Sequence, residues 1–253
     1  VFSSPSPDQI IAAAEKVDSG AGVLFIVKNY SGDIMNFQMA AEMITGPSET
    51  VLINDDVAVE DSSFTTGRRG VAATVVVEKI VGSLAESGGS LEECKNLGDK
   101  VNKNSGSMGV AFSSCIVPAA GKPTSELGDD EMEFGVGIHG EPGRRRDKIK
   151  SAQEITEELL NAIIEDLKPD NKDEILLFIN GMGGTPLSEL YLVYDNAKKL
   201  LENKKIKIVR SLVGNYCTSL EMQGASITIT KLDQELVNHW DSSVHTASIR
   251  WGI

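Results

Sequence analysis

Short apolar runs alternate with longer amphipathic stretches along the chain, and this alternation constrains the fold more than any other feature. The run at 23–29 (VLFIVKN) has the composition of a strand buried on both faces, and 174–180 resembles it. Helical patterns follow at 34–44 and 187–203. Strands that alternate with helices predict a layered α/β fold with a parallel sheet.

The chain has 253 residues, which is enough for two domains, and 41% of them are hydrophobic, which is enough for a core. Residues 102–107 (NKNSGS) are small, polar and aperiodic, as is typical of a linker. We therefore predict a first domain at 1–106, with three α/β/α layers and a mainly parallel sheet. The second domain, 107–253, is expected to be α/β with a mixed sheet.

The charge and the cysteines exclude several classes of protein. The net charge of −13 comes from scattered acidic residues and opposes nucleic-acid binding, and the basic run at 144–146 is expected to be a solvated loop. No apolar run reaches the roughly 18 residues of a membrane span. The three distant cysteines, Cys94, Cys115 and Cys217, favour a reducing compartment. We expect a cytoplasmic protein with no membrane and no nucleic-acid partner.

Three short motif matches do not indicate a cofactor or metal site, because the residues around them do not fit the motif. Residues 135–140 match G-x-G-x-x-G, but the next helical pattern waits until Ser151, so the segment is not a dinucleotide fingerprint. A zinc-deaminase reading of His139 and Glu141 lacks P-C-x-x-C. The loop at 181–186 lacks the Gly-Lys-Ser/Thr of a phosphate-binding loop. We predict neither a metal site nor a nucleotide site in this chain.

One histidine has glycines on both sides. His139 ends the alternating run at 131–138, which predicts a strand, and the missing side chains around it leave room for a small ligand. A structural or surface histidine is the alternative on the residues alone. The other two histidines lie in less suggestive places, His239 in a polar helix and His245 in the C-terminal tail.

A second candidate site follows the first strand. Lys28 and Asp33 lie at its carboxyl end, where open α/β sheets bind ligands. Asp33 also stands where the helix at 34–44 needs an N-cap, and both roles remain open. Asp55 and Asp56 follow the next strand and could add carboxylates at the same edge, although adjacent aspartates are more often solvated.

Longer segments add a resemblance to a known family. In the same order along essentially the whole chain, they closely resemble the substrate-binding K subunits of dihydroxyacetone kinases. The segments are 28–37 (KNYSGDIMNF), 55–70 (DDVAVEDSSFTTGRRG), 117–123 (VPAAGKP), 134–143 (FGVGIHGEPG) and 214–221 (GNYCTSLE).

The resemblance implies a phosphotransferase site. In this family the histidine matching His139 attacks the carbonyl carbon of dihydroxyacetone and holds the substrate as a covalent hemiaminal. Neutral imidazole is a competent nucleophile, and a ketone offers it an electrophilic carbon that an alcohol lacks. The aspartate matching Asp33 accepts the hydroxyl proton as the phosphoryl group arrives, and the lysine matching Lys28 hydrogen-bonds the substrate.

The resemblance also implies partners. The chain ends soon after Trp251, without the nucleotide-binding helical domain of the ATP-dependent members, and so looks like the stand-alone bacterial subunit. Such a subunit forms a homodimer and works with an L subunit, which holds ADP and magnesium and is rephosphorylated by a phosphotransferase-system protein. No cofactor is then expected in this chain. Family members carry a further segment with a second active-site histidine before the point matching Val1, and we expect that the sequence omits it.

Two other functions remain as alternatives. A sensing paralogue would bind dihydroxyacetone through the same histidine and activate a transcription regulator, but only the kinase needs a base at Asp33. A nicotinamide-dependent oxidoreductase would have to bind its cofactor.

Overall fold

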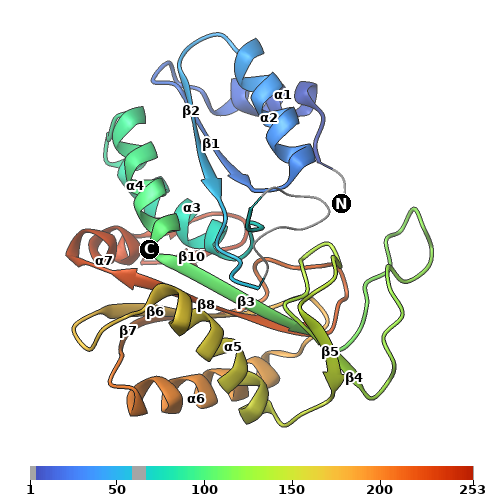
Figure 1. Ribbon diagram of the computed structural model, residues 1–253. Coiled ribbons are helices and arrows are strands. Elements are labelled where there is room, and N and C mark those ends of the chain that lie inside the picture. The colour runs from blue at the N-terminus through green and yellow to red at the C-terminus, as the bar shows by residue number, and fades with distance from the viewer. Residues whose placement is uncertain (1–3, 59–66, 253) are drawn as a thin grey trace.

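In the part of the chain that the structure describes, residues 4–58 and 67–252, six strands form one mixed sheet in this computed structural model (Figure 1). The strand order is β5-β4-β3-β8-β6-β7; β6 and β7 are parallel and the other neighbouring pairs antiparallel. This confirms the mixed sheet predicted for the second half. Residues 59–66, part of the segment 55–70 quoted above, lie outside the described residues. The strands are β3 (Ser105–Ala111), β4 (Glu131–Phe134), β5 (Arg145–Lys148), β6 (Glu174–Gly181), β7 (Lys207–Gly214) and β8 (Gly224–Leu232).

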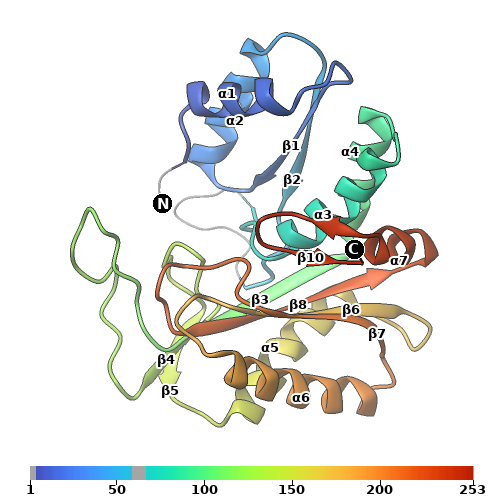
Figure 2. The same cartoon turned by 180° about the vertical axis from the view of Figure 1, so that it is seen from behind.

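Strand β6 is buried on both faces because its side chains alternate between two helical layers. Ile175 and Leu177 join a core with α5 and α6, whereas Leu176 and Phe178 join a core with α3 and α7. Figures 1 and 2 show these helices on opposite sides of the sheet. The buried strand predicted at 174–180 is confirmed. The helices are α3 (Ala73–Glu86), α5 (Ala152–Leu167), α6 (Leu187–Asn203) and α7 (Gln234–Asp241).

A second sheet, of two parallel strands among the described residues, lies between α1 and α2 on one face and α3 and α4 on the other. Val23, Phe25 and Val27 of β1 are buried against α1 and α2. Leu24 and Ile26, on the side of α3, are only partly buried, so the prediction of a strand buried on both faces was wrong for β1. The elements are β1 (Val23–Lys28), β2 (Ser48–Ile53), α1 (Pro7–Val17), α2 (Ser31–Met43) and α4 (Leu91–Lys103).

The predicted linker at 102–107 was wrong. Its first residues end α4 and its last three begin β3, which is buried along its whole length. The small residues serve close packing rather than flexibility, because a Cβ on Gly106 would lie only 3.1 Å from the Leu167 side chain. A domain boundary after residue 106 stays a prediction.

The chain patterns missed some elements, among them α1 and a C-terminal hairpin of β9 (Val244–His245) and β10 (Arg250–Trp251). The side chains of the basic run at 144–146 are exposed, as expected, but Arg145 and Arg146 lie in β5 at the sheet edge and not in a loop. Helix α3 begins at Ala73, so Arg68 and Arg69 lie before its first residue. No described helix has the length and apolar character needed to cross a membrane.

Candidate functional site

The carboxyl end of β1 leads directly into α2, which places Lys28 and Asp33 at the same end of the sheet. Helix α2 starts at Ser31, so Asp33 lies inside its first turn and the cap position is Tyr30. The N-cap role weighed for Asp33 was therefore wrong. Its carboxylate accepts no hydrogen bond from a described side chain, and a negative charge in the first turn is favourable to the helix dipole.

The alternation at 131–138 predicted that His139 lies at the end of a strand. This was wrong, because His139 lies in a loop. Strand β4 ends at Phe134, because Gly135 takes a φ of 73°, which a strand does not allow. The chain returns at Arg144, whose backbone N–H donates to the Phe134 carbonyl at 2.7 Å. We call residues 135–143 the histidine loop.

A buried carboxylate holds His139. Glu141 is 5% exposed, and its two oxygens accept from the His139 backbone N–H at 2.9 Å and from ring Nδ1 at 3.1 Å. Burial alone would raise the pKa of Glu141, but its hydrogen bonds and electrostatic interaction with His139 outweigh burial and leave the pKa below its ordinary value. An ionised carboxylate only accepts, so Nδ1 carries the proton and the lone pair of the neutral ring belongs to Nε2.

Tyr30 joins the two candidate sites. Its ring meets the His139 ring edge to face, with the centroids 4.6 Å apart, and it lies between Lys28 and Asp33 in the chain. Burial, and then the charge of Glu141, raise the pKa of Tyr30 well above its ordinary value, so the phenol stays neutral. The histidine loop therefore packs against the end of β1, a contact that the sequence patterns did not predict.

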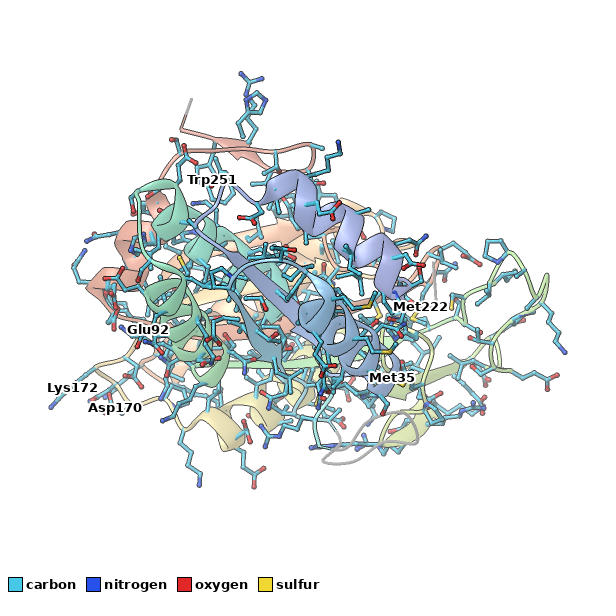
Figure 3. All side chains as sticks on the ribbon, turned by 90° about the horizontal axis from the view of Figure 1, so that it is seen from above. Met35, Glu92, Asp170, Lys172, Met222 and Trp251 are labelled. Atoms are coloured by element: carbon cyan, nitrogen blue, oxygen red, sulfur yellow. The ribbon has the colours of Figure 1, made fainter. Side chains whose placement is uncertain are left out.

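Lys28 lies near a cleft of about 880 Å³ between α3 and the C-terminal hairpin. Glu78 lines this cleft; burial raises its pKa, and the positive charge of Lys28 acts in the opposite direction. Trp251 of the hairpin, labelled in Figure 3, packs against Trp240 of α7 with the ring centroids 5.5 Å apart. The described residues that line the cleft do not include Lys28, Asp33 or His139.

Asp55 and Asp56 are buried, 1% and 2% exposed, so the expectation that they are solvated was wrong. Asp55 accepts from the backbone N–H groups of Val71 and Ala73, at 2.7 and 2.9 Å, and from the Ser107 hydroxyl. Burial raises its pKa. Asp55 thus ties the end of β2 to the start of α3 and to β3 and offers no carboxylate at the edge of the site.

No group of three or more His, Cys, Asp or Glu side chains suited to a metal ion occurs among residues 4–58 and 67–252.

A family model described as the Dak1 domain matches residues 1–248. The chain belongs to the Dak1 domain family. One Dak1 relative is the dihydroxyacetone-binding subunit DhaK of PTS-dependent dihydroxyacetone kinase 1 from Listeria innocua, 51% identical over 93% of this chain and 72% of the relative. Another is the dihydroxyacetone-binding subunit DhaK of the PEP-dependent kinase from Escherichia coli, 44% identical over 100% of this chain and 78% of the relative.

Solved structures of the same family share the fold. The dihydroxyacetone kinase operon co-activator Dha-DhaQ superposes with a TM-score of 0.87 at 32% identity, covering 94% of this chain and 75% of that one. The dihydroxyacetone kinase of C. freundii superposes with a TM-score of 0.79 at 30% identity, covering 94% of this chain and 44% of that one. The Dak1 fold therefore occurs both in a kinase and in a co-activator.

Proposed function

We propose that this chain is the dihydroxyacetone-binding subunit of a phosphoenolpyruvate-dependent dihydroxyacetone kinase. The substrate is held as a covalent hemiaminal on His139. Membership of the Dak1 family and the names of its DhaK relatives support this assignment. The observation that carries it is the hydrogen bond of 3.1 Å from His139 Nδ1 to the buried Glu141 carboxylate, because this bond leaves Nε2 as the nucleophilic nitrogen.

The proposed bond-making step balances without a cofactor. The Nε2 lone pair of His139 attacks the ketone carbon, and the carbonyl π electrons move to oxygen, which takes up a proton. The ring gives up its Nδ1 proton, so the net change is addition of N–H across the C=O bond. Glu141 accepts the hydrogen bond from Nδ1 and stabilises the positive charge that develops on the ring.

Phosphoryl transfer then depends on where the substrate hydroxyl lies. Asp33 accepts the proton of the terminal hydroxyl, and Lys28 supplies positive charge from the end of β1. We propose that a partner L subunit brings the phosphoryl group with ADP and magnesium, because phosphoryl transfer needs positioning and charge neutralisation more than covalent help. We also propose, on the basis of the family resemblance, that the subunit forms a homodimer in the cytoplasm.

The co-activator class is the competing function. It is represented by a structure 32% identical to this chain, whereas the DhaK relative from Listeria innocua is 51% identical. Turnover separates the two classes. A kinase subunit mixed with an L subunit, the phosphotransferase proteins and phosphoenolpyruvate forms dihydroxyacetone phosphate, whereas a sensor binds the ketone without phosphorylating it.

The adduct itself is tested with dihydroxyacetone labelled at its carbonyl carbon with an NMR-active isotope. On binding, the signal of that carbon is expected to leave the carbonyl region and appear where saturated carbons bonded to oxygen and nitrogen resonate. A protein that binds the ketone with an unchanged carbonyl signal would contradict the hemiaminal.

Gly137→Ala is expected to weaken ketone binding by disturbing Glu141. A Cβ at position 137 would lie 2.0 Å from Glu141 Oε2, so the carboxylate must move and its bonds to His139 weaken. The loss of a hydrogen bond to a charged group, about 1.5–3 kcal/mol, corresponds to roughly ten- to hundredfold weaker binding. Nitrogen NMR of the imidazole should also show a smaller fraction of the Nδ1-protonated tautomer.

The matched control for this substitution is Gly82→Ala. Gly82 lies on α3, and an added Cβ there meets nothing within 4 Å. Ketone binding should stay at the wild-type level. Wild-type affinity and tautomer in Gly137→Ala would mean that Glu141 does not orient the ring.

A further inference from the structure

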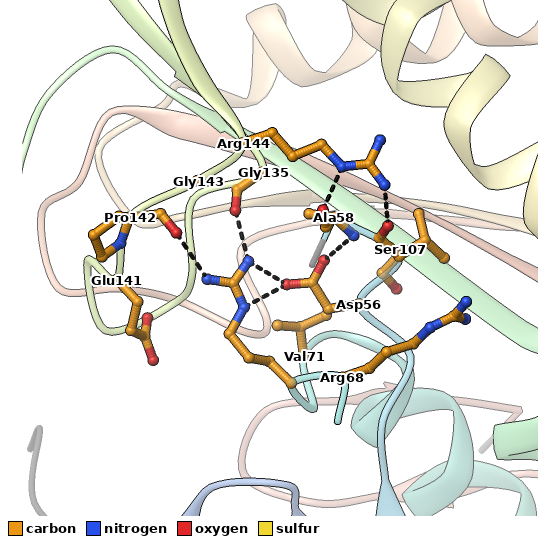
Figure 4. Close-up of polar contacts among 12 residues, drawn as sticks. Asp56, Ala58, Arg68, Val71, Ser107, Gly135, Glu141, Pro142, Gly143 and Arg144 are labelled. Atoms are coloured by element: carbon orange, nitrogen blue, oxygen red, sulfur yellow. Dashed lines mark hydrogen bonds and ion pairs between the residues drawn. The ribbon is translucent and has the colours of Figure 1, made fainter. Parts of the chain in front are cut away.

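One arginine side chain spans the base of the histidine loop from inside the protein. Arg69 is fully buried, and its Nη2 donates to the Gly135 carbonyl at 2.6 Å while Nη1 donates to the Pro142 carbonyl at 3.4 Å. These carbonyls lie at the two ends of the loop that carries His139. Figure 4 shows the polar contacts, with Gly135, Pro142 and Asp56 labelled. The guanidinium therefore fixes the width of the loop at its base.

The same guanidinium is held in place by Asp56. Its Nε and Nη2 both donate to Asp56 Oδ2, at 2.8 and 2.7 Å. The second carboxylate oxygen accepts from the Ala58 backbone N–H at 2.8 Å. With its three nitrogens shared between a carboxylate and two carbonyls, the forked group of Arg69 has a single well-defined orientation.

The backbone around Arg69 is fixed to the opposite half of the site. The Arg68 carbonyl accepts from the Asn29 side chain at 2.6 Å, and Asn29 follows Lys28 at the end of β1. Gly70 lies so close to the ends of both strands that a Cβ on it would be 2.3 Å from the carbonyl oxygen of Ile53 in β2 and 2.8 Å from the backbone nitrogen of Asn29 after β1. The main chain around Arg69 thus packs against the ends of β1 and β2, whereas the Arg69 side chain binds the histidine loop.

We propose that Arg69 is a positioning residue that sets the separation between His139 and the Lys28–Asp33 segment. Its rigid guanidinium connects the two halves of the site, the histidine loop and the end of β1. Both halves must contact one small ketone, which is covalently bonded to His139 at its central carbon and hydrogen-bonded to Asp33 through a terminal hydroxyl. This inference rests on the proposed function, since the separation matters only if both groups act on one molecule. A displacement of about 1 Å is enough to lower a rate by roughly a hundredfold.

The test is Arg69→Lys. Lysine keeps the positive charge beside Asp56, but its single nitrogen cannot bond the carboxylate and both loop carbonyls at once. We expect the dissociation constant of dihydroxyacetone to rise about tenfold, as for the loss of one charged hydrogen bond. We also expect turnover at saturating ketone, counted per adduct-forming site by NMR, to fall at least as much. A residue needed only for folding would reduce the number of such sites and leave both quantities per site unchanged.

The matched control is Arg68→Lys, the same change at the next residue. The Arg68 side chain pairs with Asp166 of α5 and points away from Asp56 (Figure 4). Dissociation constant and turnover per site should remain at wild-type values in this variant.

A double variant removes any effect of leaving one buried charge without its partner. Replacing only one member of a buried ion pair is strongly destabilising because it leaves the other charge buried without its partner, whereas replacing both members by uncharged side chains of similar volume leaves no such charge. Asp56→Asn combined with Arg69→Met is therefore expected to fold, to lose the loop contacts and to bind the ketone at least tenfold more weakly. Wild-type affinity and turnover per site in either Arg69 variant would overturn the inference, whereas absence of the adduct from the wild-type protein would overturn the proposed function instead.

Discussion

Replacing His139 with alanine is expected to abolish the covalent adduct and, with it, the phosphorylation of dihydroxyacetone. Alanine has no nucleophile, and among the described residues the site presents no second imidazole in contact with Tyr30. The measurement is NMR of the labelled ketone carbon, which should keep its carbonyl signal at every protein concentration. Weak noncovalent binding through Lys28 and Asp33 is compatible with this result.

His239→Ala is the control for the histidine variant. His239 lies on α7, where its Nδ1 is 3.0 Å from the Ser83 hydroxyl, and it has no part in the proposed chemistry. This variant should form the adduct as the wild type does. A persistent adduct in His139→Ala would assign the nucleophile to another side chain.

Replacing Asp33 with asparagine is expected to leave the adduct intact and to lower turnover by about 10²- to 10⁴-fold, the usual contribution of a general base. Asparagine has nearly the same shape but does not accept a proton at neutral pH. The structure makes this test sharper, because Asp33 lies within the first turn of α2 and is not its cap. For the stability of α2, the substitution costs only a favourable charge–dipole interaction of about 0.3–1 kcal/mol.

The first turn of α1 offers a matched control, Asp8→Asn, which makes the same change of charge at an exposed helix start. Its turnover should equal that of the wild type. If Asp33→Asn retained wild-type turnover with an intact adduct, Asp33 would have no role as a base, and the sensing function would gain support.

Sequence patterns predicted the elements with strong periodicity and missed what depends on distant contacts. The helix at 187–203 has the predicted bounds. The alternation at 131–138 misled, because Val136 and Ile138 are each 7% exposed in a loop, as buried as strand residues would be. Only the positive φ of Gly135 ends the strand, and a residue pattern does not show a backbone angle.

The site residues that were missed differ in the signal they gave. Glu141 follows His139 by two residues and was considered only in the rejected zinc-deaminase pattern, so no role was predicted for its carboxylate. Tyr30 lies between Lys28 and Asp33, yet its contact with the His139 ring joins positions more than a hundred residues apart. Arg69 lies within the quoted segment 55–70, but no role was predicted for it, because its acceptors on the histidine loop are equally remote in sequence.

The core around α3 has a consequence for how the whole molecule responds to heat and to substrate. Val51 and Ile53 of the two-stranded sheet belong to the same apolar cluster as Leu176 and Phe178 of the six-stranded sheet. A cluster shared in this way couples the melting of both sheets, so calorimetry should record a single transition. Any ketone captured on the histidine loop would then raise the melting temperature of both sheets together, by mass action on one cooperative unit.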